Sequence, residues 1–248
     1  MAASSTFQSD ITTDSAPPTK NAGIKNHMYQ LPFVYVYERT DMSTTLYGLQ
    51  IYPEIIKKEV QILRSNPECG MCHSHAESIN SKVDLSLYEE KELTFQELIL
   101  KNQVYAPTAM LRKKVVDELK GFDESLYIED WDLWLRLTYS GYKICFINEV
   151  LAYYREHDGN SYKNHLRMEV ATDQILNKWK GNEFYDLAIK NEKLRRFDFY
   201  AEIDKLRALN YLFFSLKNIG ERRVRVGLIK LFIPLNLMNF LRKIRRRN

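Results

Sequence analysis

The hydrophobic pattern changes once along the 248 residues of this chain, and that change limits the folds open to it. Up to about residue 155, short β-branched and aromatic runs alternate with segments of helical periodicity. We expect strands at residues 31–37, 143–148 and 150–155, a helix that begins at Pro53, and a short helix with a capping box formed by Thr94 and Glu97. From about residue 163 to 241 the periodicity is helical, with breaks near Gly181 and Gly220. We therefore expect an α/β body over residues 29–161 and a helical extension over 162–248, after a disordered leader over 1–28.

Composition narrows the class of protein. With 45% apolar and 27% charged residues the chain is globular, and it has no run of 18 uninterrupted apolar residues. The first 20 residues contain Lys20 but no arginine and no apolar stretch, so they resemble neither a secretory signal nor a transit peptide. Three cysteines, an odd number, favour a reducing compartment over a disulfide framework. We expect a cytoplasmic protein, with peripheral association at the membrane as a further option.

Charge is distributed unevenly. The chain carries 36 basic and 32 acidic residues, but residues 221–248 carry nine Lys or Arg and one Glu, so the rest has a net charge of −4. Basic residues flank the apolar segment 226–241, which as a helix would reach only about 24 Å, short of a ~30 Å hydrocarbon core. Residues 222–247 are thus expected to lie on an anionic membrane surface, or alternatively to pack on the body. Nucleic acid is not expected, because no aromatic residues interleave the basic ones as in a single-strand groove.

Two carboxylates begin the clearest predicted helix, residues 129–140. Glu129 and Asp130 stand at its start, Gly141 follows its end, and Asp132 and Arg136 form an i,i+4 pair of the solvated kind. The helix macrodipole alone favours acidic residues at this position, so the spacing by itself does not assign catalysis.

Four ordered motifs surround this helix: GFDESL, IEDWDLWLRL, GYKI and YYREHDGNS. In this order and at this spacing they resemble the acceptor-side half of family-2 glycosyltransferases, which are inverting enzymes of GT-A fold. The resemblance covers residues 52–161, including the segments 52–60 and 66–70. It implies an incomplete GT-A-like (Rossmann-like) domain and transfer of a sugar, of the hexosyl type, from a nucleotide-sugar to a hydroxyl.

The resemblance also implies roles for individual residues. Asp130 corresponds to the family's general base, which removes the proton of the acceptor hydroxyl. Glu129 would shape the acceptor pocket, with Trp131 and Asp132 beside it in binding acceptor or donor. A loop carrying Arg155 and His157 would face the donor diphosphate or its metal.

The nucleotide-binding half of the family is missing or degenerate in this chain. The family's Asp-x-Asp metal motif has only an imperfect counterpart in Glu38 and Asp41, which follow an apolar strand and could hold Mg²⁺ or Mn²⁺ together with His157. The resemblance nevertheless implies an enzyme acting on a glycan or lipid-linked acceptor, as in polysaccharide biosynthesis. The alternative is a non-catalytic remnant or accessory module, and a partner chain could supply the missing half.

A second motif, which could indicate a cofactor or metal site, is Cys69-Gly-Met-Cys72-His73. It matches the haem-attachment spacing C-x-x-C-H, and His75 adds a possible zinc ligand. Haem attachment requires export, and zinc would require ligands from a second segment, whereas Cys145 lies in an apolar strand. We therefore predict a plain strand over residues 69–79.

Overall fold

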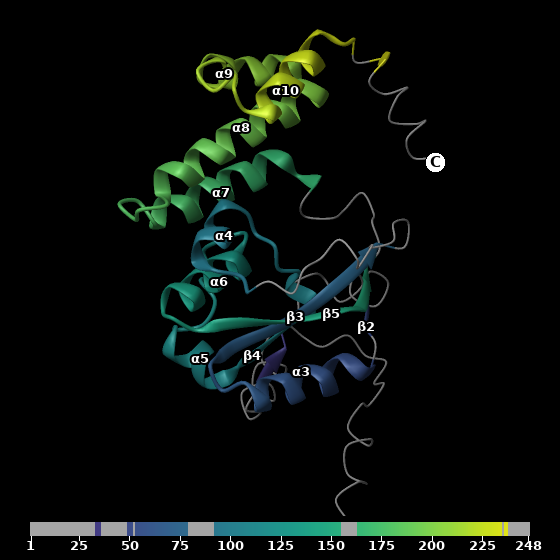
Figure 1. Cartoon of the computed structure of the whole chain (residues 1–248), viewed down its shortest axis with the longest axis vertical. Coiled ribbons are helices and arrows are strands. Elements are labelled where there is room, and N and C mark those ends of the chain that lie inside the picture. Colours follow the sequence, from purple (N-terminus) through teal and green to yellow (C-terminus); the bar gives the residue numbers. More distant parts are fainter. Residues whose placement is uncertain are drawn as a thin grey trace, which may run out of the picture.

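The computed structural model describes residues 33–35, 49–51, 53–78, 92–154, 163–234 and 236–237, and these contain a five-stranded mixed sheet with helices on both faces (Figure 1). The strand order is β1-β4-β3-β5-β2. Only the central pair β3 and β5 is parallel among these strands, and the other neighbours are antiparallel. The strands are β1 (Phe33–Tyr35), β2 (Leu49–Ile51), β3 (Cys69–Ser78), β4 (Ala109–Arg112) and β5 (Lys143–Tyr154). The predicted mixed α/β class is confirmed.

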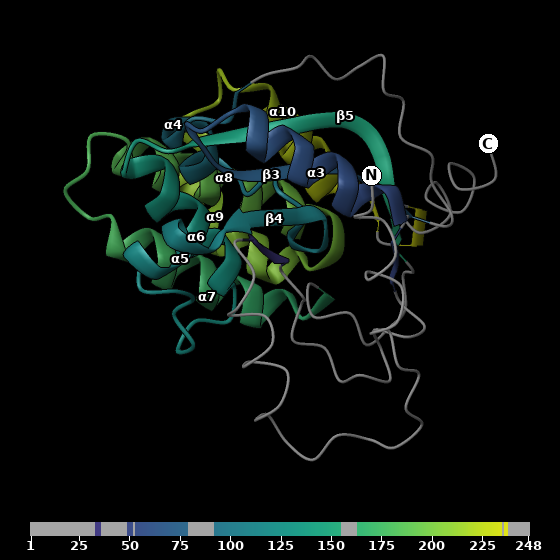
Figure 2. The same ribbon diagram turned by 90° about the horizontal axis from the view of Figure 1, so that it is seen from below.

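Helices cover the two faces of the sheet unequally. Figure 2, viewed from below, shows α3 in front of the strands, and α4 and α6 lie on the other side of the sheet in Figure 1. The helical elements are α3 (Pro53–Ser65), α4 (Phe95–Leu100), the 3₁₀ helix η2 (Ala106–Thr108), α5 (Lys113–Glu118), α6 (Glu129–Tyr139), α7 (His165–Lys178), α8 (Tyr185–Ile203), α9 (Lys205–Leu216) and α10 (Arg222–Phe232). The predicted capping box of α4 is present, because Thr94 and Glu97 each accept the other's backbone N–H.

The alternation of side chains along β3 divides the core between the two faces. Met71 packs with Trp134 of α6, whereas the next residue, Cys72, packs with Ile55 and Leu63 of α3. Successive side chains of a strand point to opposite faces, so each face of β3 has its own apolar cluster. Residues 69–78 thus form the strand β3, as predicted, and residue 79 of the predicted range lies outside the described residues.

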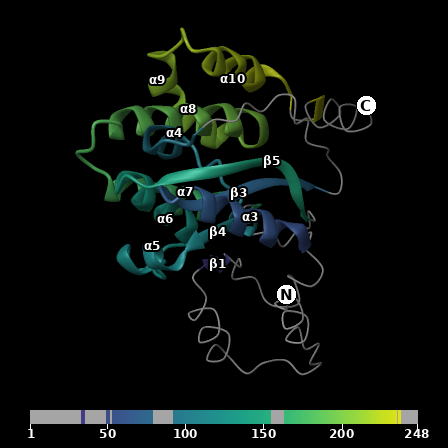
Figure 3. The same ribbon diagram turned by 60° about the horizontal axis from the view of Figure 1, so that its bottom comes forward.

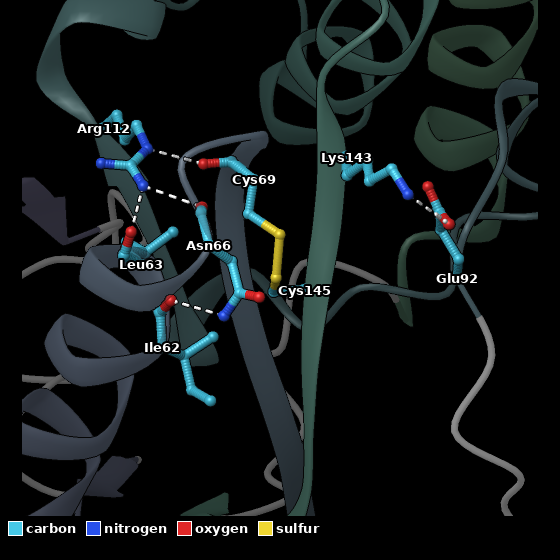
Figure 4. Close-up of a disulfide and its surroundings, with 8 residues drawn as sticks. All are labelled: Ile62, Leu63, Asn66, Cys69, Glu92, Arg112, Lys143 and Cys145. Atoms are coloured by element: carbon cyan, nitrogen blue, oxygen red, sulfur yellow. Dashed lines mark hydrogen bonds and ion pairs between the residues drawn. A yellow bond between two sulfur atoms is a disulfide. The ribbon is translucent and has the colours of Figure 1, made fainter.

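A disulfide joins the two parallel central strands at one end. Cys69 is bonded to Cys145, with their Cα atoms 5.8 Å apart (Figure 4). Beside it, Arg112 of β4 donates to the carbonyl oxygens of Cys69 at 2.7 Å, of Asn66 at 3.0 Å, and of Leu63. The expectation that the cysteines form no disulfide is therefore wrong for this pair, and Cys72 is the free, buried cysteine.

The sequence predicted two strands, 143–148 and 150–155, where the structure has the single strand β5. The polar residues Asn148 and Glu149 interrupted the apolar pattern. In the structure Asn148 contacts the His75 ring at 3.1 Å and Glu149 pairs with Lys58 of α3. The register between β3 and β5 shifts on both sides of His75, so an irregularity in a continuous strand accounts for the polar residues.

Glycines mark some, but not all, of the points where one helix ends and the next element begins. Gly141, with φ +86°, ends α6, and Gly181, with φ +92°, follows α7, as predicted. Gly220 lies between α9 and α10. A further break at Asp204 was missed: its side chain accepts the Arg207 N–H at 3.1 Å and begins α9.

The last helices form a layer on the side of α8 away from the sheet. α9 and α10 lie beside each other at this end of the molecule in Figures 1 and 3. Gly227 of α10 lies so close to α8 that an added Cβ would stand 2.8 Å from the Phe197 ring. Packing does not stop at the expected boundary near residue 162, because Ile175, Leu176 and Ala188 belong to the same apolar cluster as α6. None of the helices in the described ranges has the length and apolar character needed to cross a bilayer.

Candidate active site at the start of helix α6

Glu129 and Asp130 are the first two residues of α6, and both are partly exposed. Ile128, which precedes them, supplies no side-chain cap to the first turn. Asp130 itself accepts the backbone N–H of Trp131 through Oδ1 at 2.7 Å. A carboxylate at the amino end of a helix is stabilised as an anion by the exposed N–H groups and the macrodipole. The structure therefore places two carboxylates in the first turn of α6.

Asp132, two residues further, is fully buried and forms the ionic centre beneath them. Its Oδ2 accepts from Arg136 Nε at 2.8 Å, and its Oδ1 lies 2.6 Å from Lys178 Nζ of α7. The expectation of a solvated Asp132–Arg136 pair is wrong on the aspartate side, because the Asp132 carboxylate is buried and is paired with two cations, the partly exposed Arg136 and the exposed Lys178. Such networks are costly to leave half-paired, which fixes the position of the first turn of α6.

The same two cations also hold the turn before α6. Arg136 donates to the carbonyl oxygens of Gly121, at 2.8 Å, and of Leu119, while Lys178 Nζ lies 3.0 Å from Asp123 Oδ2. The hydrogen bonds of Ser125 and Lys178 lower the pKa of Asp123 to about 2. Burial acts to lower the pKa of Lys178, but its bonds to Asp132 and Asp123 outweigh this and raise it. The GFDE motif is thereby tied to the helix that carries Asp130.

Trp131 anchors the helix start from the other side. Its indole Nε1 donates to the Leu98 carbonyl oxygen of α4 at 2.8 Å, and the side chain is buried. Trp131 and Asp132 were both predicted to contact acceptor or donor. In the structure their side chains face the interior, so their observed contacts position Asp130, and direct contact with a ligand stays a prediction.

The remaining predicted site residues lie outside the described residues. These are Glu38 and Asp41, proposed with His157 as metal ligands, and Arg155, proposed to face the donor. Within the described ranges, no group of three or more His, Cys, Asp or Glu side chains could hold a metal ion.

The haem and zinc interpretations of the cysteine motif are contradicted by the disulfide. Because Cys69 is bonded to Cys145, its sulfur can form neither a haem thioether nor a bond to zinc. Cys72 is buried, and burial followed by the nearby Glu59 raises the pKa of its thiol far above the usual range. The thiolate needed as a metal ligand is therefore disfavoured.

The sequence did not indicate two buried titratable groups at the sheet. Glu59 of α3 is fully buried, neither carboxyl oxygen has a hydrogen-bond partner among the described residues, and burial raises its pKa to about 9. His73 is buried too, and its pKa is lowered to about 4 by burial and then by His75. The helical spacing of Glu59 with Ile55 and Leu63, four residues on either side, was the one signal that could have placed its carboxyl inward.

Lys178 was also missed, because it lies 46 positions beyond Asp132 and no local pattern links them. Comparison of the chain with models of known protein families and with curated proteins gives no significant match. The site is therefore interpreted from its own geometry and from the sequence motifs.

Proposed function

We propose that the chain is an inverting, nucleotide-sugar-dependent glycosyltransferase of the GT-A type, with Asp130 as general base. The proposal rests on the motifs of the sequence and on one structural observation. Glu129 and Asp130 are partly exposed at an uncapped helix start, while Asp132 beneath them is buried and paired with Arg136 and Lys178. The buried and paired Asp132 fixes the helix start that carries Asp130, and a base in proton transfer requires such a supported position.

The step assigned to Asp130 is a proton transfer. As the acceptor hydroxyl oxygen attacks the anomeric carbon of the donor, the bond from that carbon to the diphosphate breaks, and the hydroxyl proton passes to Asp130. Attack from the face opposite the leaving group inverts the anomeric centre. Glu129, one residue earlier, would accept hydrogen bonds from the other hydroxyls of the acceptor and orient it.

We include Mg²⁺ or Mn²⁺ in the proposal only as a group that would neutralise charge on the departing diphosphate. The described residues do not offer a fitting set of ligands, since they contain no cluster of three metal-binding side chains. The proposed step at Asp130 therefore does not depend on the metal.

Donor binding separates an enzyme from a module that retains only the acceptor half. We expect calorimetric titration of the full chain with UDP, GDP and dTDP, each with Mn²⁺ or Mg²⁺, to show saturable binding of one nucleotide. Asp130→Asn should bind that nucleotide as the wild type does, because the base contacts the acceptor. Glu38→Ala/Asp41→Ala should weaken any metal-dependent part of the binding.

The absence of binding to all three nucleotides, with either metal, would contradict a stand-alone enzyme. It would favour the accessory module, or one half of a two-chain enzyme. If Asp130→Asn bound the nucleotide much more weakly than the wild type, Asp130 would contact the donor rather than the acceptor.

A further inference from the structure

Helix α9 has an apolar stripe whose side chains are at least half exposed. Leu206, Leu209 and Phe213 are 79%, 50% and 73% exposed, and their spacing of three and four residues places them on one side of the helix. The opposite side, with the fully buried Ala208 and Ser215, packs toward α8. A single exposed leucine is ordinary, but a continuous row of large ones indicates a contact surface.

Helix α10 continues this surface. Val224 and Gly227 are buried against α8, whereas Ile229 and Phe232 are 62% and 82% exposed. Lys205 at the start of α9 donates to the carbonyl oxygens of Leu231, at 2.6 Å, and of Ile233 near the end of α10. Leu206 follows Lys205, and Phe232 lies between Leu231 and Ile233. The exposed apolar residues of α9 and α10 therefore come together where α9 begins and α10 ends.

We call these five residues the α9–α10 apolar face: Leu206, Leu209, Phe213, Ile229 and Phe232. Both helices lie on the far side of α8 from the sheet (Figures 1 and 3), so the face is at the opposite end of the layered body from α3.

Basic side chains border the apolar face. Arg222, Arg223 and Arg225 are exposed in the first turn of α10, and Lys217 lies 4.6 Å over the Phe213 ring. Residues 205–248 carry twelve Lys or Arg and a single acidic residue, Glu221, whereas the chain as a whole has a net charge of +4. Basic residues are therefore in large excess in the sequence of α9, α10 and the residues that follow them.

We infer that the α9–α10 apolar face is a docking surface for an anionic lipid bilayer, into which its large apolar side chains insert while the surrounding arginines and lysines contact lipid phosphates. This inference stands on the helical layer alone and does not depend on the proposed glycosyl transfer. It extends the basic C-terminal segment foreseen in the sequence to α9, which supplies three of the five apolar side chains.

Charge complementarity selects this occupant over a second copy of the chain. Two such faces brought together would bring a basic rim from each copy into one interface, and like charges oppose that contact. An amphipathic surface that combines large apolar side chains with a basic rim fits the interface of an anionic membrane, where both kinds of residue are satisfied. Nucleic acid would satisfy the arginines and leave the leucines without a partner.

The test is sedimentation of the full chain with phosphatidylcholine vesicles, with and without about 30% phosphatidylserine. We expect binding to the anionic vesicles only, and loss of it in Leu206→Glu/Phe232→Glu. Ile56→Glu, which alters a 52% exposed isoleucine on α3, is the matched control and should bind as the wild type does.

The arginines are tested separately. Arg222→Gln/Arg225→Gln should bind anionic vesicles about 25-fold more weakly, at about fivefold for each lost charge, while Lys57→Gln/Arg64→Gln on α3 should not. Equal sedimentation with neutral and anionic vesicles, or none with either, would overturn the inference. So would a dimer, seen by analytical ultracentrifugation, that Leu206→Glu/Phe232→Glu dissociates without any vesicle binding by the wild type.

Discussion

At the residue scale, two buried titratable side chains change the free energy of unfolding in opposite directions as the pH changes. Glu59 has a pKa near 9 in the folded protein against an ordinary 4.5, so between these values the folded state holds a proton that the unfolded state lacks. Stability therefore falls as the pH rises through this range, by about 1.4 kcal/mol per pH unit. His73 has a pKa near 4 against 6.5, so it makes stability fall as the pH drops from 6.5 to 4.

Together, the contributions of Glu59 and His73 predict a free energy of unfolding that is first constant and then declines as the pH rises. Between pH 4.5 and 6.5 the two effects cancel, and above pH 6.5 that of Glu59 remains. We expect the free energy of unfolding, measured by urea denaturation, to fall by about 3 kcal/mol from pH 6.5 to 9. Glu59→Gln should remove this decline, because its side chain does not ionise. A wild-type decline that persists in Glu59→Gln would show that the buried carboxyl is not its source.

Asp132 is the second residue with a defined energetic role. Asp132→Asn removes the charge that pairs with Arg136 and Lys178, and both cations are then left beside an interior amide. We expect a loss of about 2 kcal/mol in the free energy of unfolding, since hydrogen bonds to charged groups are among the stronger ones. Asp117→Asn breaks the exposed i,i+4 pair with Lys113 and should cost less than about 0.5 kcal/mol. Equal losses in the two variants would mean that the Asp132 network does not hold the helix.

At the scale of elements, the parallel strands β3 and β5 are joined both by hydrogen bonds and by a covalent link. The Cys69–Cys145 disulfide closes a segment of 76 residues that contains β4, α5 and α6. A cross-link of this span restricts the unfolded chain over the whole region that carries Asp130.

Reduction should therefore weaken this part of the fold. We expect dithiothreitol to lower the free energy of unfolding of the wild type by about 2–4 kcal/mol. Cys69→Ala/Cys145→Ala should start at a lower stability and show no response to the reductant. If the wild type is equally indifferent to dithiothreitol, the disulfide does not contribute in solution.

The sequence predicted elements best where the signal is local. α3 begins at Pro53, α4 has its capping box, and α6 ends before Gly141, all as the pattern indicated. It failed at β5, because the polar Asn148 and Glu149 are satisfied by His75 and Lys58 from distant segments. Local patterns carry no information about such partners.

At the scale of the whole molecule, the candidate site too was predicted where the signal is local and missed where it depends on distant segments. Glu129 and Asp130 were placed correctly at the start of a helix, since acidic residues and helical periodicity are read locally. The ionic network around the buried Asp132 was not foreseen, because Lys178 comes from α7 and was assigned to a separate extension. The body and the first helices after it share one apolar core, so the support of the site depends on both.

Glycosyl transfer with Asp130 as base is tested most directly by product analysis. The full chain, with the nucleotide-sugar whose nucleotide it binds, should give a glycoside of inverted anomeric configuration, resolved by proton NMR. Asp130→Asn should lower kcat at least about 100-fold, the contribution of a general base. The control Glu54→Gln, which alters the second residue of α3 as Asp130 is the second of α6, should leave kcat unchanged. A product with retained configuration, or equal kcat in Asp130→Asn and the wild type, would contradict the account.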